Sequence, residues 1–337
     1  MLELLSEPAP LVRSQWNNIS FDAPILIDID QPLSPTFYCI YGIELVLLVI
    51  STIFMTWFIR LLYSFQMFHI NLKLMLVFHF VIYLFGGISR FYLILVQMDI
   101  VTDLSSPLFL ISSFFRCQYY AHAICAVPGI VVERAFATIF VKDYESKNRS
   151  WIIISCLSYL FIQSQFYAIP LTFFRPPVYY PIIFACLAIG ISKLLLNFLY
   201  RKNSEILETT ANGTHRYTLS KKFQIEENLR VMWYLRGLGL LFFLCISFIV
   251  AIIVLPWTFF GQNSFYGQLF ISMFDFSLSA AGIISPIICM FYLYQTNYHP
   301  FMKRFNLRND KVEPDRRLST TITDSRIYFE QLQKSWS

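Results

Sequence analysis

Long apolar runs are the feature that most constrains the fold of this chain. Several of them exceed the roughly 18 residues that argue for a membrane-spanning helix. Spans in hydrocarbon must be helices or a closed barrel, and barrel strands are only about ten residues long with alternating polarity. The sequence therefore predicts an all-α membrane protein, a bundle of seven transmembrane helices, with spans at about 37–58, 74–96, 112–141, 151–174, 178–200, 237–260 and 265–294.

Composition supports this class and argues against several others. The chain is 56% hydrophobic and only 14% charged, whereas soluble domains carry about 25% charge. The net charge of +5 comes from residues in the loops, so it indicates orientation in a lipid bilayer and not nucleic-acid binding. The cysteines form no C-x-x-C pair, and we therefore expect no zinc site and no disulfide framework.

Lysine and arginine are concentrated in alternate connections, which predicts an outside N-terminus and an inside C-terminus. Residues 1–36 are then an extracellular segment, 37–295 the seven-transmembrane domain, and 296–337 a cytoplasmic tail that begins with a short interfacial helix. We expect the glycosylation sequon at Asn18 to carry a glycan, and those at Asn148 and Asn212 to carry none.

The third apolar run carries charges near both of its ends. Arg116 and the pair Glu133-Arg134 are about 27 Å apart in a helix, close to the thickness of a hydrocarbon core. One interpretation is an ordinary span whose end charges reach water. The other is a receptor's third helix with an acid–arginine pair at its cytoplasmic end.

Ionisable residues also lie within the predicted spans, where they are costly and need partners. Glu44, Arg90 and Asp275 all lie in the outer parts of their spans. They could form a structural ion pair between helices one, two and seven, which we favour, or contact a ligand in an outer cavity. The candidate ligand-pocket residues are Arg90, Tyr119, Tyr120, His122 and Asp275.

Three short motifs accompany the third, sixth and seventh spans. They are Val132-Glu133-Arg134-Ala-Phe-Ala-Thr138 with Asp143-Tyr144-Glu145, then Tyr217-Thr-Leu-Ser220 with Phe223-Gln224 and Glu227-Asn228-Leu-Arg230, then Ser285-Pro286-Ile-Ile-Cys289. Together they resemble a G-protein-coupled receptor of the nematode serpentine chemoreceptor type, the Sre group (serpentine receptor class epsilon).

The resemblance implies specific roles for these residues. The arginine that ends the third helix pairs with its acidic neighbour at rest and later contributes to a G-protein pocket, so the coupling residues would be Glu133, Arg134, Asp143, Tyr144, Glu227, Asn228 and Arg230. Ser285 and Pro286 would form a hinge in the seventh helix, because proline removes a backbone hydrogen bond. A disulfide from Cys117 would need Cys39 or Cys186; inert thiols are the favoured alternative.

The function that follows is a chemosensory receptor and not an enzyme. It would bind an odorant-like or pheromone-like small molecule in an outer cavity and activate a heterotrimeric G protein, with no cofactor and no metal. The resemblance suggests the plasma membrane, with the ciliary membrane of sensory neurons as a candidate location. A multipass transporter of a small solute is the alternative, although no repeat relates the two halves of the chain.

Overall fold

The structure is a computed structural model, and it describes most of the chain between residues 12 and 298. The described residues are 12–24, 34–64, 70–141, 149–174, 176–177, 179–211, 224–226, 228–233, 235–237, 248, 251, 259–260 and 264–298. Three predicted coupling residues, Asp143, Tyr144 and Glu227, lie outside them. So do most of the span predicted at 237–260, the predicted interfacial helix, and the sequons at Asn148 and Asn212.

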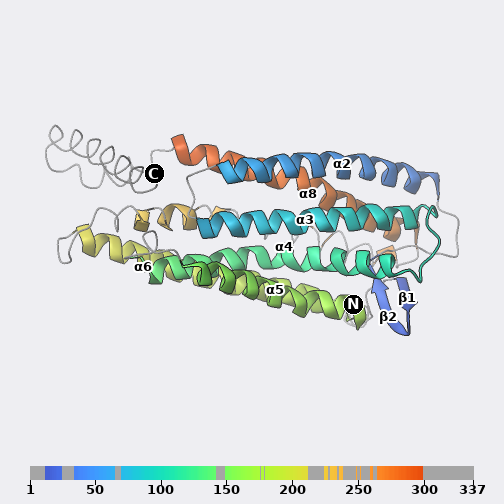
Figure 1. Ribbon diagram of the computed structural model, residues 1–337, viewed down its shortest axis with the longest axis horizontal. Coiled ribbons are helices and arrows are strands. Elements are labelled where there is room, and N and C mark those ends of the chain that lie inside the picture. The colour runs from blue at the N-terminus through green and yellow to red at the C-terminus, as the bar shows by residue number, and fades with distance from the viewer. Residues whose placement is uncertain are drawn as a thin grey trace. The chain divides into compact units, whose positions relative to one another are not determined.

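Six long helices make up most of the described chain (Figure 1). Each contains a stretch that is long and apolar enough to cross a membrane. Their bounds are α2 Pro35–Ser64, α3 Ile70–Gln97, α4 Pro107–Ile139, α5 Ser150–Phe173, α6 Tyr179–Ala211 and α8 Phe265–Tyr298.

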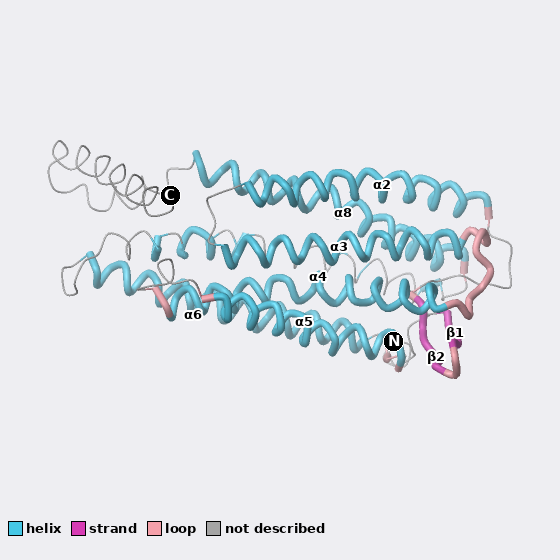
Figure 2. The backbone as a smooth tube through the Cα atoms, viewed as in Figure 1, coloured by secondary structure: helices cyan, strands magenta, loops and turns pink. Residues whose placement is uncertain are grey.

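Helix α4 is the central element of the bundle. It packs against α3, α5 and α6, and Figure 2 shows it running between α3 and α5. More of its apolar stretch is buried than that of any other described span. The side chains of α4 therefore have protein neighbours on most sides, which explains why charged residues are tolerated along it.

Close contact between α3 and α4 depends on a residue without a side chain. A Cβ added at Gly86 of α3 would lie 2.6 Å from the Cβ of Tyr119 on α4, closer than two carbon atoms can approach without a shift. Small residues at helix interfaces allow this approach in membranes, where packing replaces the hydrophobic effect as the driving force. Gly86 thereby sets the position of Tyr119, which belongs to the site described below.

We expect Gly86→Ala to lower the thermal midpoint of the purified protein, because overpacking of this kind costs about 1–3 kcal/mol. Gly190→Ala is the matched control, since nothing lies within 4 Å of a Cβ added there. Thermal unfolding of both variants in detergent measures the difference. Equal midpoints would show that α3 and α4 can separate without cost.

A β-hairpin that the sequence analysis did not predict precedes the first helix. Strand β1 Val12–Trp16 pairs antiparallel with β2 Ile19–Ala23. The two turn residues, Asn17 and Asn18, have φ values of 45° and 65°, as two-residue hairpin turns require. The exposed Asn18 sequon therefore lies at the hairpin tip.

The hairpin is packed on the bundle at the end where α4 begins (Figure 2). Phe21 is 1% exposed, and its ring lies 5.6 Å from that of Phe109 at the start of α4, edge to face. The Ser14 hydroxyl donates to the Leu104 carbonyl at 2.5 Å. Part of the segment expected to be simply exposed is thus a cover for the ends of α3, α4 and α5.

Helix α8 continues through Pro286. The chain divides at this residue into two compact units, residues 1–286 and 287–337. The site described next lies wholly within the first unit.

Candidate functional site

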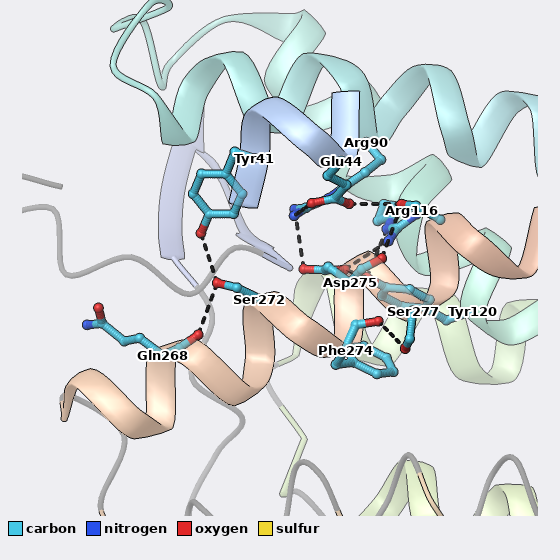
Figure 3. Close-up of polar contacts among 11 residues, drawn as sticks. Tyr41, Glu44, Arg90, Arg116, Tyr120, Gln268, Ser272, Phe274, Asp275 and Ser277 are labelled. Atoms are coloured by element: carbon cyan, nitrogen blue, oxygen red, sulfur yellow. Dashed lines mark hydrogen bonds and ion pairs between the residues drawn. The ribbon is translucent and has the colours of Figure 1, made fainter. Parts of the chain in front are cut away.

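Four charged side chains from four helices meet inside the bundle, and we call them the Arg90 cluster (Figure 3). They are Glu44 of α2, Arg90 of α3, Arg116 of α4 and Asp275 of α8. None is more than 6% exposed. Two cations and two anions cancel, which is the condition under which buried charges are tolerated.

Arg90 and Glu44 form the more complete pair of the cluster. The Nε of Arg90 donates to Oε1 of Glu44 and its Nη2 donates to Oε2, both at 2.8 Å. This bidentate geometry is the strongest that an arginine and a carboxylate can adopt. The third nitrogen of Arg90, Nη1, lies 3.3 Å from Oδ2 of Asp275. The prediction that Arg90 pairs with an acid is confirmed, and it pairs with both.

Arg116 holds Asp275 with a single nitrogen. Its Nη2 donates to Oδ1 of Asp275 at 2.8 Å, and its Nε donates to the Tyr120 hydroxyl at 2.9 Å. The same hydroxyl donates to Oδ1 of Asp275 at 2.9 Å. The guanidinium carbon lies 5.5 Å from the ring centroid of Tyr119 and 4.9 Å from that of Tyr120, within cation–π range.

Hydroxyl groups surround the charges and join α8 to α2 and α3. The Ser279 hydroxyl donates to Oε1 of Glu44 at 2.9 Å, while its carbonyl accepts from Ser51 at 2.9 Å and from Tyr83 at 3.0 Å. The Tyr83 hydroxyl has room only because residue 282 is glycine: a Cβ there would overlap it. Every one of these contacts crosses between helices, so the cluster fixes the position of α8.

A second group, the Arg134 cluster, lies near the other end of α4 and consists of Glu133, Arg134 and Asn228. Arg134 donates to both oxygens of its neighbour Glu133, at 2.5 and 2.6 Å. Its Nη1 donates to Oδ1 of Asn228 at 3.1 Å. Glu133 is 0% and Arg134 and Asn228 are each 1% exposed. Arg134 therefore connects α4 to the residues that precede the predicted sixth span.

Further hydrogen bonds extend the Arg134 cluster to α6. The Thr138 hydroxyl donates to the Arg134 carbonyl at 2.9 Å. Asn203 of α6, which is fully buried, donates from Nδ2 to the Thr138 hydroxyl at 2.8 Å. Asn203 carries no signal in the sequence, because a single asparagine near a helix end has no recognisable pattern.

Apolar packing holds the segment around Asn228 in place. The described residues 224–226, 228–233 and 235–237 are helical. Ile225, Leu229 and Met232 are at most 1% exposed, while Trp233 is 47% exposed. One face of this helix is thus buried, on Val141 just after α4 and on Leu207 of α6. This packing presents Asn228 to Arg134.

Comparison with known proteins now identifies the family. Residues 104–337 match the family model described as Sre G protein-coupled chemoreceptor. The chain belongs to the Sre family. The match confirms the resemblance drawn from the motifs. It also confirms the fold class, a seven-transmembrane helix bundle, of which the described residues contain six candidate spans. Sre proteins are receptors of the serpentine class.

Curated relatives agree with the assignment to Sre. Serpentine receptor class epsilon-12 of Caenorhabditis elegans is 26% identical over 319 residues, which cover 88% of this chain and 92% of that protein. Serpentine receptor class epsilon-13 of the same organism is 25% identical over 268 residues, 70% of this chain and 72% of that one. Serpentine receptor class epsilon-21 is 34% identical over a shorter stretch, 35% and 33% of the two chains.

The Sre receptor brings together four of the five residues predicted to line a ligand pocket. Arg90, Tyr120 and Asp275 contact one another directly or through Arg116, and Tyr119 lies beneath the Arg116 guanidinium. One interpretation had Arg116 reaching water at the end of its span. Its side chain is instead 2% exposed and paired with Asp275, well after the start of α4 at Pro107.

His122, the fifth predicted pocket residue, lies apart from this group. Its ring is stacked on that of His79 across the α3–α4 interface, with the centroids 5.2 Å apart and the planes 25° apart. Only the packing of α3 on α4 brings the two histidines together. Among the described residues, no three His, Cys, Asp or Glu side chains are arranged to hold a metal ion.

The remaining predicted residues have simple positions in the Sre fold. Arg230 is partly buried in the helix that carries Asn228. Pro286 is buried and Ser285 partly buried within α8. Cys39, Cys117 and Cys186 are free thiols, so neither of the disulfides considered for Cys117 is present.

Proposed function

We propose that this Sre receptor binds a small-molecule ligand, odorant-like or pheromone-like, in a helical cavity beside the Arg90 cluster and activates a heterotrimeric G protein from the Arg134 cluster. Arg116 and Arg134 lie about 27 Å apart along α4, so the two clusters lie near opposite ends of one helix. A signal between them has to take the form of a shift between two arrangements of the bundle.

The observation that carries this proposal is that Arg134 binds Glu133 and Asn228 at the same time. Its guanidinium contacts Glu133 within α4 and Asn228 outside it. Such an arrangement holds the segment that precedes the predicted sixth span against α4 in the resting state. An active state that frees Arg134 would let the two segments separate and offer the arginine to a G protein.

Glu133→Gln tests the resting-state part of this mechanism. We expect it to raise ligand-independent nucleotide exchange by about fivefold or more, because losing the charge weakens the resting pair by about 1–3 kcal/mol. The measurement is exchange on purified heterotrimeric G proteins added to membranes. Glu205→Gln, at an exposed position on α6, is the matched control. Wild-type basal exchange in Glu133→Gln would argue against the resting role of the pair.

Orientation and location belong to the same proposal. We infer that the hairpin end of the bundle is extracellular and the Arg134 end cytoplasmic, in the plasma membrane or the ciliary membrane of a sensory neuron. We expect a glycan at Asn18, which is exposed at the hairpin tip, and its loss in Asn18→Gln, seen as a faster gel mobility. A glycan at Asn212 instead would invert the topology.

A further inference from the structure

The two arginines of the Arg90 cluster are held unequally. Arg90 donates from two nitrogens to Glu44 in a bidentate pair. Arg116 instead donates one hydrogen bond to Asp275 and one to Tyr120. A bidentate pair is stronger and more specific than a single charged hydrogen bond. Arg116 is therefore the cation of the cluster whose acid is more easily exchanged.

Aromatic rings line the site around Arg116. The rings of Tyr119 and Tyr120 face its guanidinium, and the ring of Phe274 on α8 lies 6.0 Å from that of Tyr120. Figure 3 shows Phe274 and Tyr120 beside Asp275. A cation bounded by apolar ring surface suits a compact ligand that combines an anionic group with an apolar or aromatic body.

Asp275 has a second cation within reach. Its Oδ2 lies 3.3 Å from Nη1 of Arg90, and that nitrogen makes no hydrogen bond to any described residue. If Arg116 paired with another anion, Asp275 would keep Arg90 as a partner, because it could move closer to Nη1 of Arg90. The cluster thus contains both the acid that leaves Arg116 and the nitrogen that receives it.

We propose that Arg116 recognises the carboxylate group of the ligand, and that this carboxylate exchanges with Asp275. The inference rests on the proposed function and adds the chemical class of the ligand, a small apolar or aromatic carboxylate. No covalent bond changes: one ion pair forms, and the Arg116–Asp275 contact breaks. Because Asp275 is on α8 and Arg116 on α4, the exchange removes the ion pair between these helices and leaves the Tyr120 hydrogen bond, about three turns before Pro286.

The charges of the cluster make the proposal quantitative. In the wild type, a bound carboxylate brings a third anion to two cations. In Asp275→Asn the cluster starts with one excess positive charge, so the same ligand neutralises it. Like charges at close range cost several kcal/mol, and we therefore expect the variant to bind the ligand at least about tenfold more tightly.

Benzoate and benzamide are the probes, since they share a shape and differ in charge. Binding is followed as the ligand-dependent shift in thermal midpoint of purified receptor in detergent, without G protein. We expect Asp275→Asn to bind benzoate at least about tenfold more tightly than wild type, and neither protein to respond to benzamide. Arg116→Gln should lose the benzoate response.

Two further variants test the carboxylate exchange even if Asp275→Asn does not fold. Tyr120→Phe removes one donor to Asp275 while leaving every charge in place, and we expect it to bind benzoate more tightly than wild type even if Asp275→Asn does not fold. Glu44→Gln raises the net charge equally but beside Arg90, and we expect a smaller gain. Benzoate binding that is unchanged in Arg116→Gln, or a benzamide response equal to that of benzoate, would overturn the assignment.

The binding measurement and the signalling measurement test the two proposals separately. Carboxylate binding at Arg116 without nucleotide exchange would contradict the proposed function alone. Nucleotide exchange in response to other compounds, with no charge-dependent binding of benzoate to any variant, would contradict the carboxylate exchange alone.

Discussion

Substitution of Arg134 by alanine is expected to abolish nucleotide exchange on the G protein, down to the level measured without receptor. The guanidinium is the group that would contact the G protein once it is freed, and alanine offers no donor in its place. The measurement is exchange in membranes from cells in which the amount of receptor has been determined. This is the largest effect we expect on signalling.

Arg134→Ala could lose activity because it misfolds, and a double variant separates misfolding from a loss of coupling. Without Arg134, the fully buried Glu133 loses the cation that both of its oxygens contact. Removing one member of a buried ion pair costs about 3–5 kcal/mol. Glu133→Gln combined with Arg134→Ala removes both charges. It should reach the membrane as Glu133→Gln does, yet remain silent where Glu133→Gln is active. These two proteins differ only at residue 134, so equal activity in both would exclude a coupling role for the arginine.

The largest expected effect on stability comes from Arg90→Leu. The side chains of Arg90 and Glu44 are 0% exposed, and removing one member of a buried ion pair costs about 3–5 kcal/mol. That is a large part of the roughly 5–15 kcal/mol that stabilises a typical protein. We expect little folded receptor at the cell surface, as measured with an antibody against an N-terminal tag.

Replacing both members of the pair should restore delivery. In Glu44→Leu with Arg90→Leu no charge is left without a partner, and apolar replacement of a buried pair is often neutral or stabilising. Arg116 and Asp275 still neutralise each other in this variant. A double variant as poorly delivered as Arg90→Leu would mean that the arginine matters for more than its pairing with Glu44.

The fold class and the pairing of Arg90 could be predicted because each follows from one strong physical constraint. Apolar length specifies membrane helices, and the cost of charge in hydrocarbon demands a partner for Arg90. Glu44 and Asp275 lie at matching depths in their spans, so the sequence identified both acids. Their geometry could not be predicted, because it depends on how α2, α3 and α8 pack.

The burial of Arg116 was not foreseen, although a local signal bears on it. Ser106 caps α4, accepting from the Phe109 amide at 3.2 Å, and Pro107 follows at the first helical position. A serine followed by proline is a helix-start signal. It would have placed Arg116 about two and a half turns into the helix, instead of about one turn. With that start, Arg116 and Tyr120 fall one turn apart on one face.

The hairpin also had a readable signal. Val12, Ser14 and Trp16 alternate with Arg13 and Gln15, and two asparagines follow. Alternation before a pair of turn-forming residues predicts a hairpin. The stacking of His79 on His122 had no such signal, because nothing local to either residue indicates the other.

The neutrality of both clusters has a consequence for the electrical behaviour of the receptor. Moving one elementary charge through a membrane potential involves about 2.3 kcal/mol per 100 mV. The two arginines and two acids of the Arg90 cluster sum to zero, and so do Glu133 and Arg134. A displacement of either group as a unit therefore transfers no net charge, and only a change that separates the ions of a cluster would respond to the membrane voltage.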